Sequence, residues 1–341
     1  MGKYKIVTEL DKNKWAEFVN NHPHGNIFQT PEMFEVYQNT KKYEPVFVAI
    51  INEKEEILGT LLAVIQKEYS GLLGNFTARA IIFGGPLIKD NDPDVLDFVL
   101  KEYDEIIKRK AIYSQFRNFW DWGDSKEIFI KNGLEYEEHY NVLVDLEKDA
   151  DTLFSKLHTS KRRQIRKALK SGVSICEAEN KNEIEKLYEI LLDLYVKKVK
   201  KPIPPLSLFL NLFRILNPIN SIKIFVIKYN DKIVGGIICP ISFNKFNKVI
   251  YEFYIGSHND YKKFYPGILS TWAPIKWGNE NGLSKFDFMG AGNPYEDYGV
   301  RDFKLKFGGE LVNYGRFEKV HKTVLMEIGK MGFKILQKIK K

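Results

Sequence analysis

Apolar and polar stretches alternate along this chain in a way that predicts short strands separated by amphipathic helices. Two apolar runs at 45–51 and 57–66 flank a polar turn at 52–56, which is typical of a β-hairpin. A strand is predicted at 78–83, and the helical spacing of the apolar residues after it predicts a helix at 95–108. Strands alternating with helices in this way indicate a mixed α/β fold.

The second half of the chain repeats this plan. The hairpin pattern at 224–238 matches the one at 46–62, and Gly235 and Gly59 fall at the same place in the two copies. Each copy is followed by another strand and then a long helix. We therefore predict two related mixed α/β domains, at 1–148 and 149–318, that face each other across a cleft. The length of the chain, 341 residues, also exceeds what a single hydrophobic core usually supports.

Basic residues concentrate on a helix predicted at about 152–171. Four of them follow the spacing i, i+3, i+4, i+7 and so form one stripe, with Lys161 and Arg162 beside it: Arg163, Arg166, Lys167 and Lys170. The stripe is either a solvated face or an anion site for the phosphate of a nucleotide or RNA. The net charge of +8 favours anionic partners but does not choose between these two readings. A second basic run, at 197–201, precedes several prolines and is predicted to be a loop.

The segment 319–341 is predicted to be a basic amphipathic helix, because apolar residues recur among its lysines. Such a helix can lie on an anionic bilayer or pack on the body of the protein. The sequence has neither a signal core at its start nor an apolar run of about 20 residues, so we expect a cytoplasmic protein, at the inner face of the membrane if this helix binds lipid. Cys176 and Cys239 fall in predicted strands and are expected to be buried hydrophobes.

The common catalytic motifs are absent from the sequence. It has no Walker loop, dinucleotide fingerprint or nucleophile elbow, and nothing completes a metal site around His22 and His24. The remaining candidates lie in the C-terminal third, where a strand ends at Gly256 and another runs into a turn at Gly290. A short helix at 300–307 is predicted to bury an apolar face formed by Val300, Phe303 and Phe307. It places Lys304 at the edge of this face, so that its ammonium could point into a cleft.

These segments together resemble the Fem family of aminoacyl-tRNA-dependent peptidyltransferases. The matching stretches span nearly the whole chain: 24–29, 161–168 with Gly172, Tyr254 with Gly256 and Ser257, 286–288, and Phe303 and Lys304 with 307–309. The resemblance implies two tandem GNAT-like domains, here without the coiled-coil arm of some members. It also implies transfer of an amino acid from charged tRNA to an amine of a peptidoglycan or cell-surface precursor, with no separate cofactor and no DNA partner.

Site residues follow from the same resemblance. Lys304 would stabilise the oxyanion formed at the ester carbonyl, Phe303 would shape the wall beside it, and Tyr254 would hydrogen-bond the substrate. Asp287 would either orient the amine or satisfy a nearby backbone donor. The candidate substrate-binding residues are Arg163, Arg166, Lys167, Lys170, Gln29 and Gly290.

The departures from the family pattern lie where UDP-muropeptide is bound. Met33 replaces a tryptophan that usually marks the helix after Gln29, and Glu35 and Tyr37 stand where we would look for a lysine. Pro205 and Phe209 replace an arginine and a tyrosine. We therefore expect an altered acceptor.

Two other functions remain open. One is an acyl-CoA-dependent N-acyltransferase, although the turn at 262–267 contains a proline and a single glycine and so offers few amides to pyrophosphate. The other is a non-catalytic module that binds anions or RNA.

Overall fold

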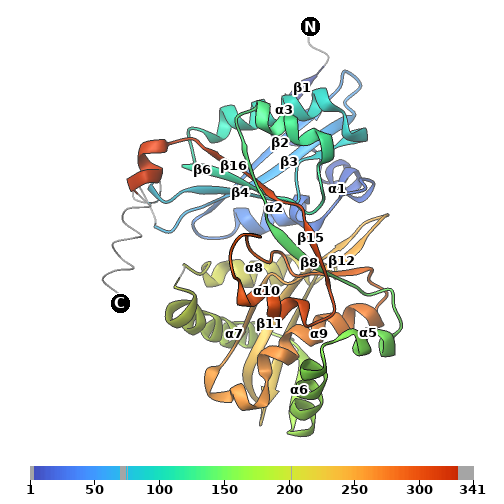
Figure 1. Cartoon of the computed structure of the whole chain (residues 1–341). Coiled ribbons are helices and arrows are strands. Elements are labelled where there is room, and N and C mark those ends of the chain that lie inside the picture. Colours follow the sequence, from blue (N-terminus) through green and yellow to red (C-terminus); the bar gives the residue numbers. More distant parts are fainter. Residues whose placement is uncertain (1–3, 70–73, 75, 201, 329–341) are drawn as a thin grey trace. The chain divides into compact units, whose positions relative to one another are not determined.

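A computed structural model describes residues 4–69, 74, 76–200 and 202–328 (Figure 1). The chain forms two compact units, Met1–Glu138 with Tyr314–Lys341 and His139–Asn313. Each unit is built on an eight-stranded, largely antiparallel sheet with helices packed on it, so the predicted mixed α/β class with two domains is confirmed.

Unit 1 has the strand order β1-β2-β3-β4-β6-β16-β7, with β5 paired to β3. Its elements are β1 (Lys5–Val7), α1 (Lys12–Asn20), η1 (Ile27–Gln29), α2 (Pro31–Gln38), β2 (Tyr43–Ile51), β3 (Ile57–Gln66), β4 (Arg79–Phe83), β5 (Leu87–Ile88), η3 (Lys89–Asn91), α3 (Pro93–Ile107), β6 (Tyr113–Arg117), η4 (Gly123–Ser125), α4 (Lys126–Lys131), β7 (Glu135–Glu137) and β16 (Arg316–Val320).

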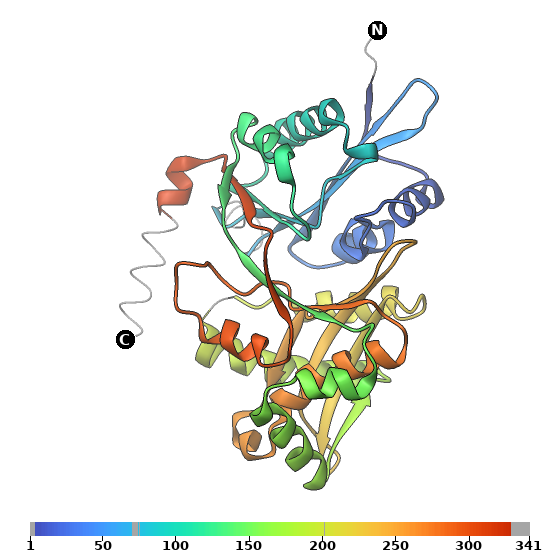
Figure 2. The same ribbon diagram turned by 45° about the vertical axis from the view of Figure 1, so that its right-hand side comes forward.

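Helices cover both faces of this sheet, with α3 and α4 on one side and α1 and α2 on the other (Figure 2). Residues of β2 therefore alternate between two buried environments. Val48 belongs to the core beneath α3, whereas the ring of Phe47 stacks on Trp15 of α1 with centroids 3.8 Å apart. This explains why β2 is an almost continuous apolar run rather than an alternating one.

Unit 2 has the strand order β15-β8-β14-β12-β11-β10-β9, with β13 paired to β11. Its elements are β8 (Tyr140–Asp145), α5 (Ala150–Lys156), α6 (Thr159–Lys170), β9 (Val173–Glu177), α7 (Lys181–Leu194), the π-helical turn η5 (Tyr195–Val199), α8 (Leu206–Leu216), β10 (Ile222–Tyr229), β11 (Lys232–Phe243), β12 (Lys248–Tyr251), β13 (Tyr254–Ser257), η6 (Asn259–Phe264), α9 (Pro266–Glu280), β14 (Lys285–Asp287), α10 (Gly299–Leu305) and β15 (Glu310–Asn313).

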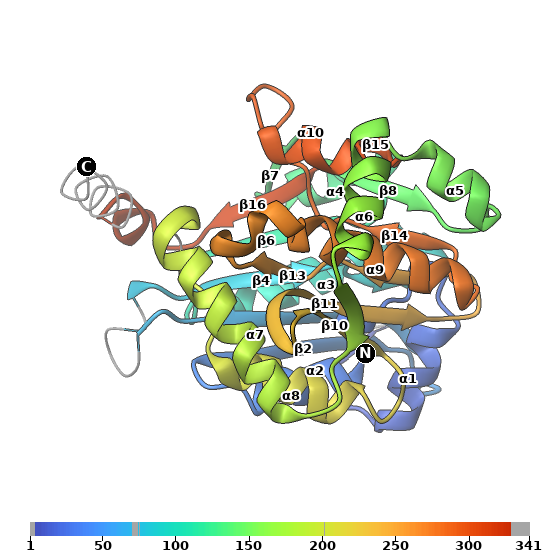
Figure 3. The same cartoon turned by 90° about the horizontal axis from the view of Figure 1, so that it is seen from below.

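Seen from below, α7 and α8 lie on one side of β10 and β11, and α6 and α9 lie on the other (Figure 3). In the described part of unit 2 the longest helix is α9, at 15 residues, so this part contains no coiled-coil arm. Across the described residues of the whole chain, no helix is both long enough and apolar enough to cross a membrane.

The internal repeat is visible in the two hairpins. The β2–β3 pairing shifts register beside Gly59, which faces Ile50, and the β10–β11 pairing shifts beside Gly235, which faces Ile227. A β-carbon on Gly59 would lie 3.1 Å from Val95 in the first turn of α3, and one on Gly235 would lie 3.3 Å from Pro266, which starts α9. Both glycines therefore allow a bulged strand to pack closely against the following helix.

The two units exchange strands, which moves the domain boundaries away from the predicted 148 and 318. In unit 1 the parallel pair β4 and β6 is continued by β16, which comes from the end of the chain. In unit 2 the parallel pair β12 and β14 is continued by β8, which directly follows unit 1 in the sequence. Because β8 pairs with β14 and β15, it belongs to the second sheet rather than to the first.

Five local expectations differ from the structure. The helix predicted at 152–171 is broken into α5 and α6 at Leu157, whose backbone is extended. The first three residues of the basic run at 197–201, which was predicted to be a loop, belong to the π-helical turn η5. Val300 is exposed rather than buried, and Cys176 is only partly buried, whereas Cys239 is buried. Residues 319 and 320 belong to β16, 323–328 are helical, and the remainder of the predicted C-terminal helix, 329–341, lies outside the described residues.

Gly308, which follows α10, lies directly against the last residue of α5, Lys156. Its φ is +82°, and a β-carbon there would lie 3.0 Å from both Cβ and O of Lys156. We predict that Gly308→Ala destabilises unit 2 by about 1–3 kcal/mol, because backbone strain adds to a close contact. Gly172 has the same φ of +82°, but a β-carbon added there would meet nothing within 4 Å, so Gly172→Ala isolates the backbone contribution. Urea unfolding of both variants measures the difference, and equal losses would show that the Lys156 contact has no effect.

A buried polar network joins β16 to the core of unit 1. Ser114 Oγ lies 2.8 Å from His321 Nε2 and 2.8 Å from the Tyr103 hydroxyl, and His321 Nδ1 lies 3.5 Å from Asp104 Oδ1. The order Ser–His–Asp resembles a hydrolase triad, but Ser114 is only 1% exposed. The cavity beside it holds about 10 Å³, too little for a substrate, so the network is structural.

This network makes the stability of unit 1 depend on pH. Burial lowers the pKa of His321 to about 4, with the ammoniums of Lys319 and Lys322 adding to the effect and Asp104 opposing it. Between that pKa and the unfolded value near 6.5 the unfolded chain binds the extra proton, so stability falls as the pH falls. We predict a loss of about 1–2 kcal/mol from this histidine between pH 7 and pH 5. Hydrogen exchange of β6 and β16 measures it, and an equally steep loss in His321→Asn would contradict the assignment.

Candidate active site

The candidate site lies where two parallel strands of unit 2 separate. The pair β12–β14 ends with Tyr251 opposite Asp287, and Glu252 N still donates to Asp287 O at 2.8 Å. From Tyr254 onward the chain pairs with β11 instead, as β13. The carboxyl ends of parallel strands are where α/β folds usually place ligands. The parting of β12–β13 from β14 therefore brings Glu252, Tyr254, Asp287 and the following turn to one place.

Lys304 of α10 closes this opening. Its ammonium donates to Phe288 O at 2.7 Å and Gly290 O at 2.9 Å, and it pairs with Glu252 Oε1 at 3.0 Å. These contacts use all three N–H donors of the ammonium. The lysine is 8% exposed, so the expectation of a side chain at a cleft edge is replaced by a buried, fully coordinated ion pair.

Glu252 is a candidate site residue that the sequence analysis missed. Its Oε1 pairs with Lys304, while its Oε2 is buried and has no hydrogen-bond partner among the described residues. Burial raises the pKa of Glu252, Lys304 opposes the rise, and the nearby Asp287 adds to it. One oxygen of this carboxylate is bound to an ammonium and the other has no hydrogen-bond partner among the described residues. With its raised pKa, such a carboxylate is suited to accept a proton. The only sequence signal was a glutamate between apolar residues at the end of a strand.

Asp287 serves the backbone. Its Oδ1 accepts from Met289 N at 2.6 Å and from Asn141 Nδ2 at 2.7 Å, while Asn141 Oδ1 accepts from Gly290 N at 2.9 Å. Burial raises the pKa of Asp287, and these donors oppose the rise. Of the two predicted roles for Asp287, the structure shows the backbone one, which fixes the turn that presents the Phe288 and Gly290 carbonyls to Lys304.

Two aromatic residues flank these polar groups in the chain. Tyr254 is partly buried, and its ring lies edge-on to Phe209 of α8 with centroids 5.1 Å apart. Phe303 precedes Lys304 on α10, packs against Phe307 at 5.3 Å, and carries the ammonium of Lys161 4.0 Å above its ring. The structure thus brings together Lys304, Asp287 and Gly290 in unit 2. Tyr254 and Phe303 neighbour this set along the chain, two residues after Glu252 and one before Lys304.

The other predicted substrate-binding residues lie elsewhere. Arg163, Arg166, Lys167 and Lys170 form an exposed face of α6, where Arg166 lies over Phe154 and Lys167 over Tyr265. Gln29 belongs to unit 1 and is fully buried. Its amide binds backbone groups of Leu62 and Phe83, so its hydrogen-bonding capacity holds the fold together.

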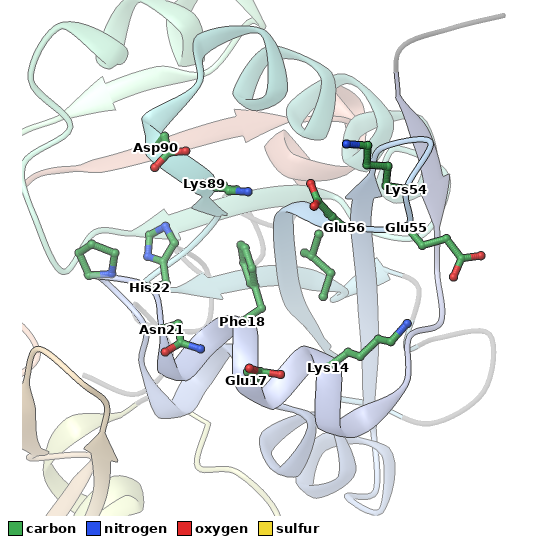
Figure 4. Close-up of a pocket in the computed structure, with 12 residues that line it drawn as sticks. Lys14, Glu17, Phe18, Asn21, His22, Lys54, Glu55, Glu56, Lys89 and Asp90 are labelled. Carbon is green, nitrogen blue, oxygen red and sulfur yellow. The ribbon is translucent and has the colours of Figure 1, made fainter.

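The corresponding position in unit 1 lacks this chemistry. There Gly84 N donates to Arg117 O at 3.0 Å, as Glu252 N does to Asp287 O, so a glycine stands where unit 2 has its carboxylate. A hollow of about 640 Å³ does occur in unit 1, between α1, the β2–β3 turn and η3 (Figure 4). Its rim carries both ammonium and carboxylate groups around Phe18, so it presents no convergent set of one charge and contains none of the predicted catalytic residues.

Among the described residues, no group of three or more His, Cys, Asp or Glu side chains could hold a metal ion. The chemistry available at the unit 2 site is therefore a buried base, a buried ammonium and oriented carbonyls. Such a set can deprotonate a nucleophile and stabilise negative charge that develops on an oxygen.

Residues 155–297 match the model of the acetyltransferase (GNAT) domain family. The structure of FemX has a TM-score of 0.71 at 15% identity, covering 95% of this chain and 99% of that one. Residues 155–297 therefore form a GNAT-type acetyltransferase domain, and the chain has the fold of FemX. The matched segment includes Glu252, Tyr254 and Asp287, and α10 with Lys304 follows it.

Other solved structures have the same fold. The structure of L-PGS from Bacillus licheniformis has a TM-score of 0.57 at 15% identity, with 96% of this chain and 98% of that one covered. A tandem GNAT protein from the clavulanic acid biosynthesis pathway has a TM-score of 0.58 at 9% identity, with coverage of 93% and 98%. At these identities the likeness concerns the fold. No curated protein sequence matches this chain.

Proposed function

We propose that the unit 2 site transfers an aminoacyl group from charged tRNA to an amine of a peptidoglycan or other cell-surface precursor. The observation that carries this proposal is the buried Lys304–Glu252 pair, in which one carboxylate oxygen has no partner among the described residues. An amine nucleophile must lose a proton during the transfer, and Glu252 Oε2 is a buried acceptor for it. No separate cofactor takes part.

The reaction balances with these groups alone. The amine nitrogen attacks the ester carbonyl carbon, and its proton passes to Glu252. The carbonyl oxygen becomes an oxyanion, which exchanges with one of the backbone carbonyls now bound to Lys304 and accepts from its ammonium. When the C–O ester bond breaks, Glu252 returns the proton to the ribose oxygen, and an amide and an uncharged tRNA are released.

The start of α9 favours tRNA over coenzyme A as the donor. Pyrophosphate is commonly held by consecutive free amides at a helix N-terminus. Here Pro266 has no N–H, and the amides of Ile268 and Leu269 both donate to Tyr265 O, at 3.0 Å and 3.2 Å. Of the first four residues of α9, only Gly267 keeps a free amide. The resemblance to the Fem family points the same way.

The acceptor is expected to differ from UDP-muropeptide. Met33 and Tyr37 of α2 are buried in the core, and Glu35 forms an ion pair with Lys12. Neither Glu35 nor Tyr37 therefore offers a positive charge to a nucleotide. Phe209 is buried against Tyr254. We therefore propose a lipid-linked precursor as the acceptor, which together with charged tRNA would be met at the cytoplasmic face of the membrane.

The test is a transfer assay with purified protein, charged tRNA or acyl-CoA as donor, and lipid-linked or nucleotide-linked precursors as acceptors. Mass spectrometry of the acceptor would show the mass of an amino acid added from charged tRNA. Transfer from acyl-CoA alone would identify an N-acyltransferase instead. Binding of tRNA without transfer from either donor would support the non-catalytic module.

A further inference from the structure

A second buried lysine lies close to the candidate site and is bonded quite differently from Lys304. Lys161, in the first turn of α6, is 6% exposed, and its ammonium lies 4.0 Å above the ring of Phe303 and 5.4 Å from the centre of Phe307. Among the described residues it has neither a hydrogen-bond acceptor nor a carboxylate within ion-pair distance. The sequence had placed Lys161 merely beside an exposed basic stripe.

Backbone contacts between the start of α6 and the end of α10 place the Lys161 ammonium beside Phe303. The break at Leu157 turns α6 away from α5, and His158 N donates to Lys306 O at 2.9 Å, which ties the start of α6 to the end of α10. Gly308 allows Lys156 to approach the same segment. These contacts fix the first turn of α6 against the helix that carries Phe303 and Lys304.

The surroundings of Lys161 are positive and lack a balancing charge. Burial, with a smaller contribution from the nearby Lys306, lowers its pKa to about 8, and no carboxylate opposes the change. The first turn of α6 contains no acidic residue, although the N-terminal end of a helix favours negative charge. Arg162 Nε is also buried without a hydrogen-bond partner among the described residues. A buried cation that lacks a partner is costly, so such positions usually serve a ligand.

We propose that Lys161 and Arg162, at the start of α6, form a binding site for a phosphate group of the donor substrate. This inference rests on the proposed function, because the phosphate would belong to the donor whose acyl group is held beside Lys304. A phosphate oxygen would supply the missing negative charge to Lys161 and accept from Arg162 Nε, and the positive end of the α6 dipole would add to the attraction. The phosphate can come from the 3′-terminal region of tRNA or from the pyrophosphate of coenzyme A.

The test uses the full chain with inorganic pyrophosphate as the probe, at constant ionic strength. Thermal unfolding should show that pyrophosphate stabilises the wild type, and titration should give a Kd that Lys161→Met weakens by about 10- to 100-fold, as for loss of a charge-assisted hydrogen bond. Lys161→Arg should retain most of the affinity. Lys181→Met, which removes an exposed lysine paired with Glu185, is the matched control and should bind like the wild type.

Stability separates this role from a purely structural one. Removing an unpaired buried charge should leave the Tm of Lys161→Met without pyrophosphate unchanged or raised, whereas a structural cation–π role predicts a lower Tm. If Lys161→Met does not fold, Arg162→Gln provides the same binding comparison. An unchanged pyrophosphate Kd in these variants, or no stabilisation of the wild type, would overturn the proposal.

Competition identifies the source of the phosphate. Displacement of pyrophosphate by tRNA but not by coenzyme A, dependent on Lys161, would support both the phosphate site and the proposed donor. Displacement by coenzyme A alone would support the phosphate site while contradicting the tRNA donor. Displacement by neither would overturn the assignment of this site to the donor.

Discussion

Replacing Glu252 by glutamine is expected to slow acyl transfer by about 10²–10⁴-fold, the usual range for loss of a general base. Glutamine keeps the size of the side chain and can still accept from Lys304, but it cannot take a proton from the amine. The pair with Lys304 holds only Oε1, so the lost function is that of Oε2. Rates measured under single-turnover conditions report the chemical step directly.

The pH dependence of the rate gives a second readout of the same residue. The base acts only when deprotonated, and burial raises the pKa of Glu252. The rate should therefore climb with pH through an acid limb that lies above the ordinary range for glutamate, and Glu252→Gln should lose that limb. Glu280→Gln, which alters an exposed glutamate paired with Lys276, is the matched control. An unaltered profile in Glu252→Gln would exclude this residue as the base.

Replacing Lys304 by methionine is expected to lower transfer by about 10²–10³-fold, as for loss of an oxyanion donor. The structure adds an effect on folding that the sequence did not suggest. Because Lys304 is buried and paired with buried Glu252, its removal should also destabilise unit 2 by about 3–5 kcal/mol. Urea unfolding measures this loss.

Combining Lys304→Met with Glu252→Gln separates the two effects. The double variant contains no unpaired buried charge at this point, so most of the stability should return while transfer stays low. The interaction term of this double-mutant cycle measures the ion pair. Normal transfer by Lys304→Met at a temperature where it is folded would remove the lysine from the mechanism.

Local patterns in the sequence predicted the architecture well, because strand alternation, helical spacing and glycine-dependent bulges act over a few residues. Gly59 and Gly235 were sufficient to indicate the repeat. The exchange of β8 and β16 could not be predicted in this way, since it depends on pairing between segments far apart in the chain. The helical spacing of Val300 likewise could not show that the first turn of α10 faces solvent.

The candidate site was predicted only in part for the same reason. The resemblance identified Lys304, but not that its charge is balanced by Glu252, 52 positions earlier in the numbering of the chain. Lys161 was grouped with its exposed neighbours. A step of one residue along a helix turns the side chain by about 100°, so neighbouring lysines can face solvent or, as Lys161 does, the ring of Phe303. Partners and burial of this kind are properties of the assembled unit.

The most direct test of the central claim is single-turnover transfer from an isotopically labelled aminoacyl-tRNA to an amine acceptor, comparing the wild type with the Glu252→Gln, Lys304→Met double variant. The account predicts label in an amide of the acceptor with the wild type and a rate lower by at least about 10²-fold with the double variant. Equal rates for the two proteins would contradict it.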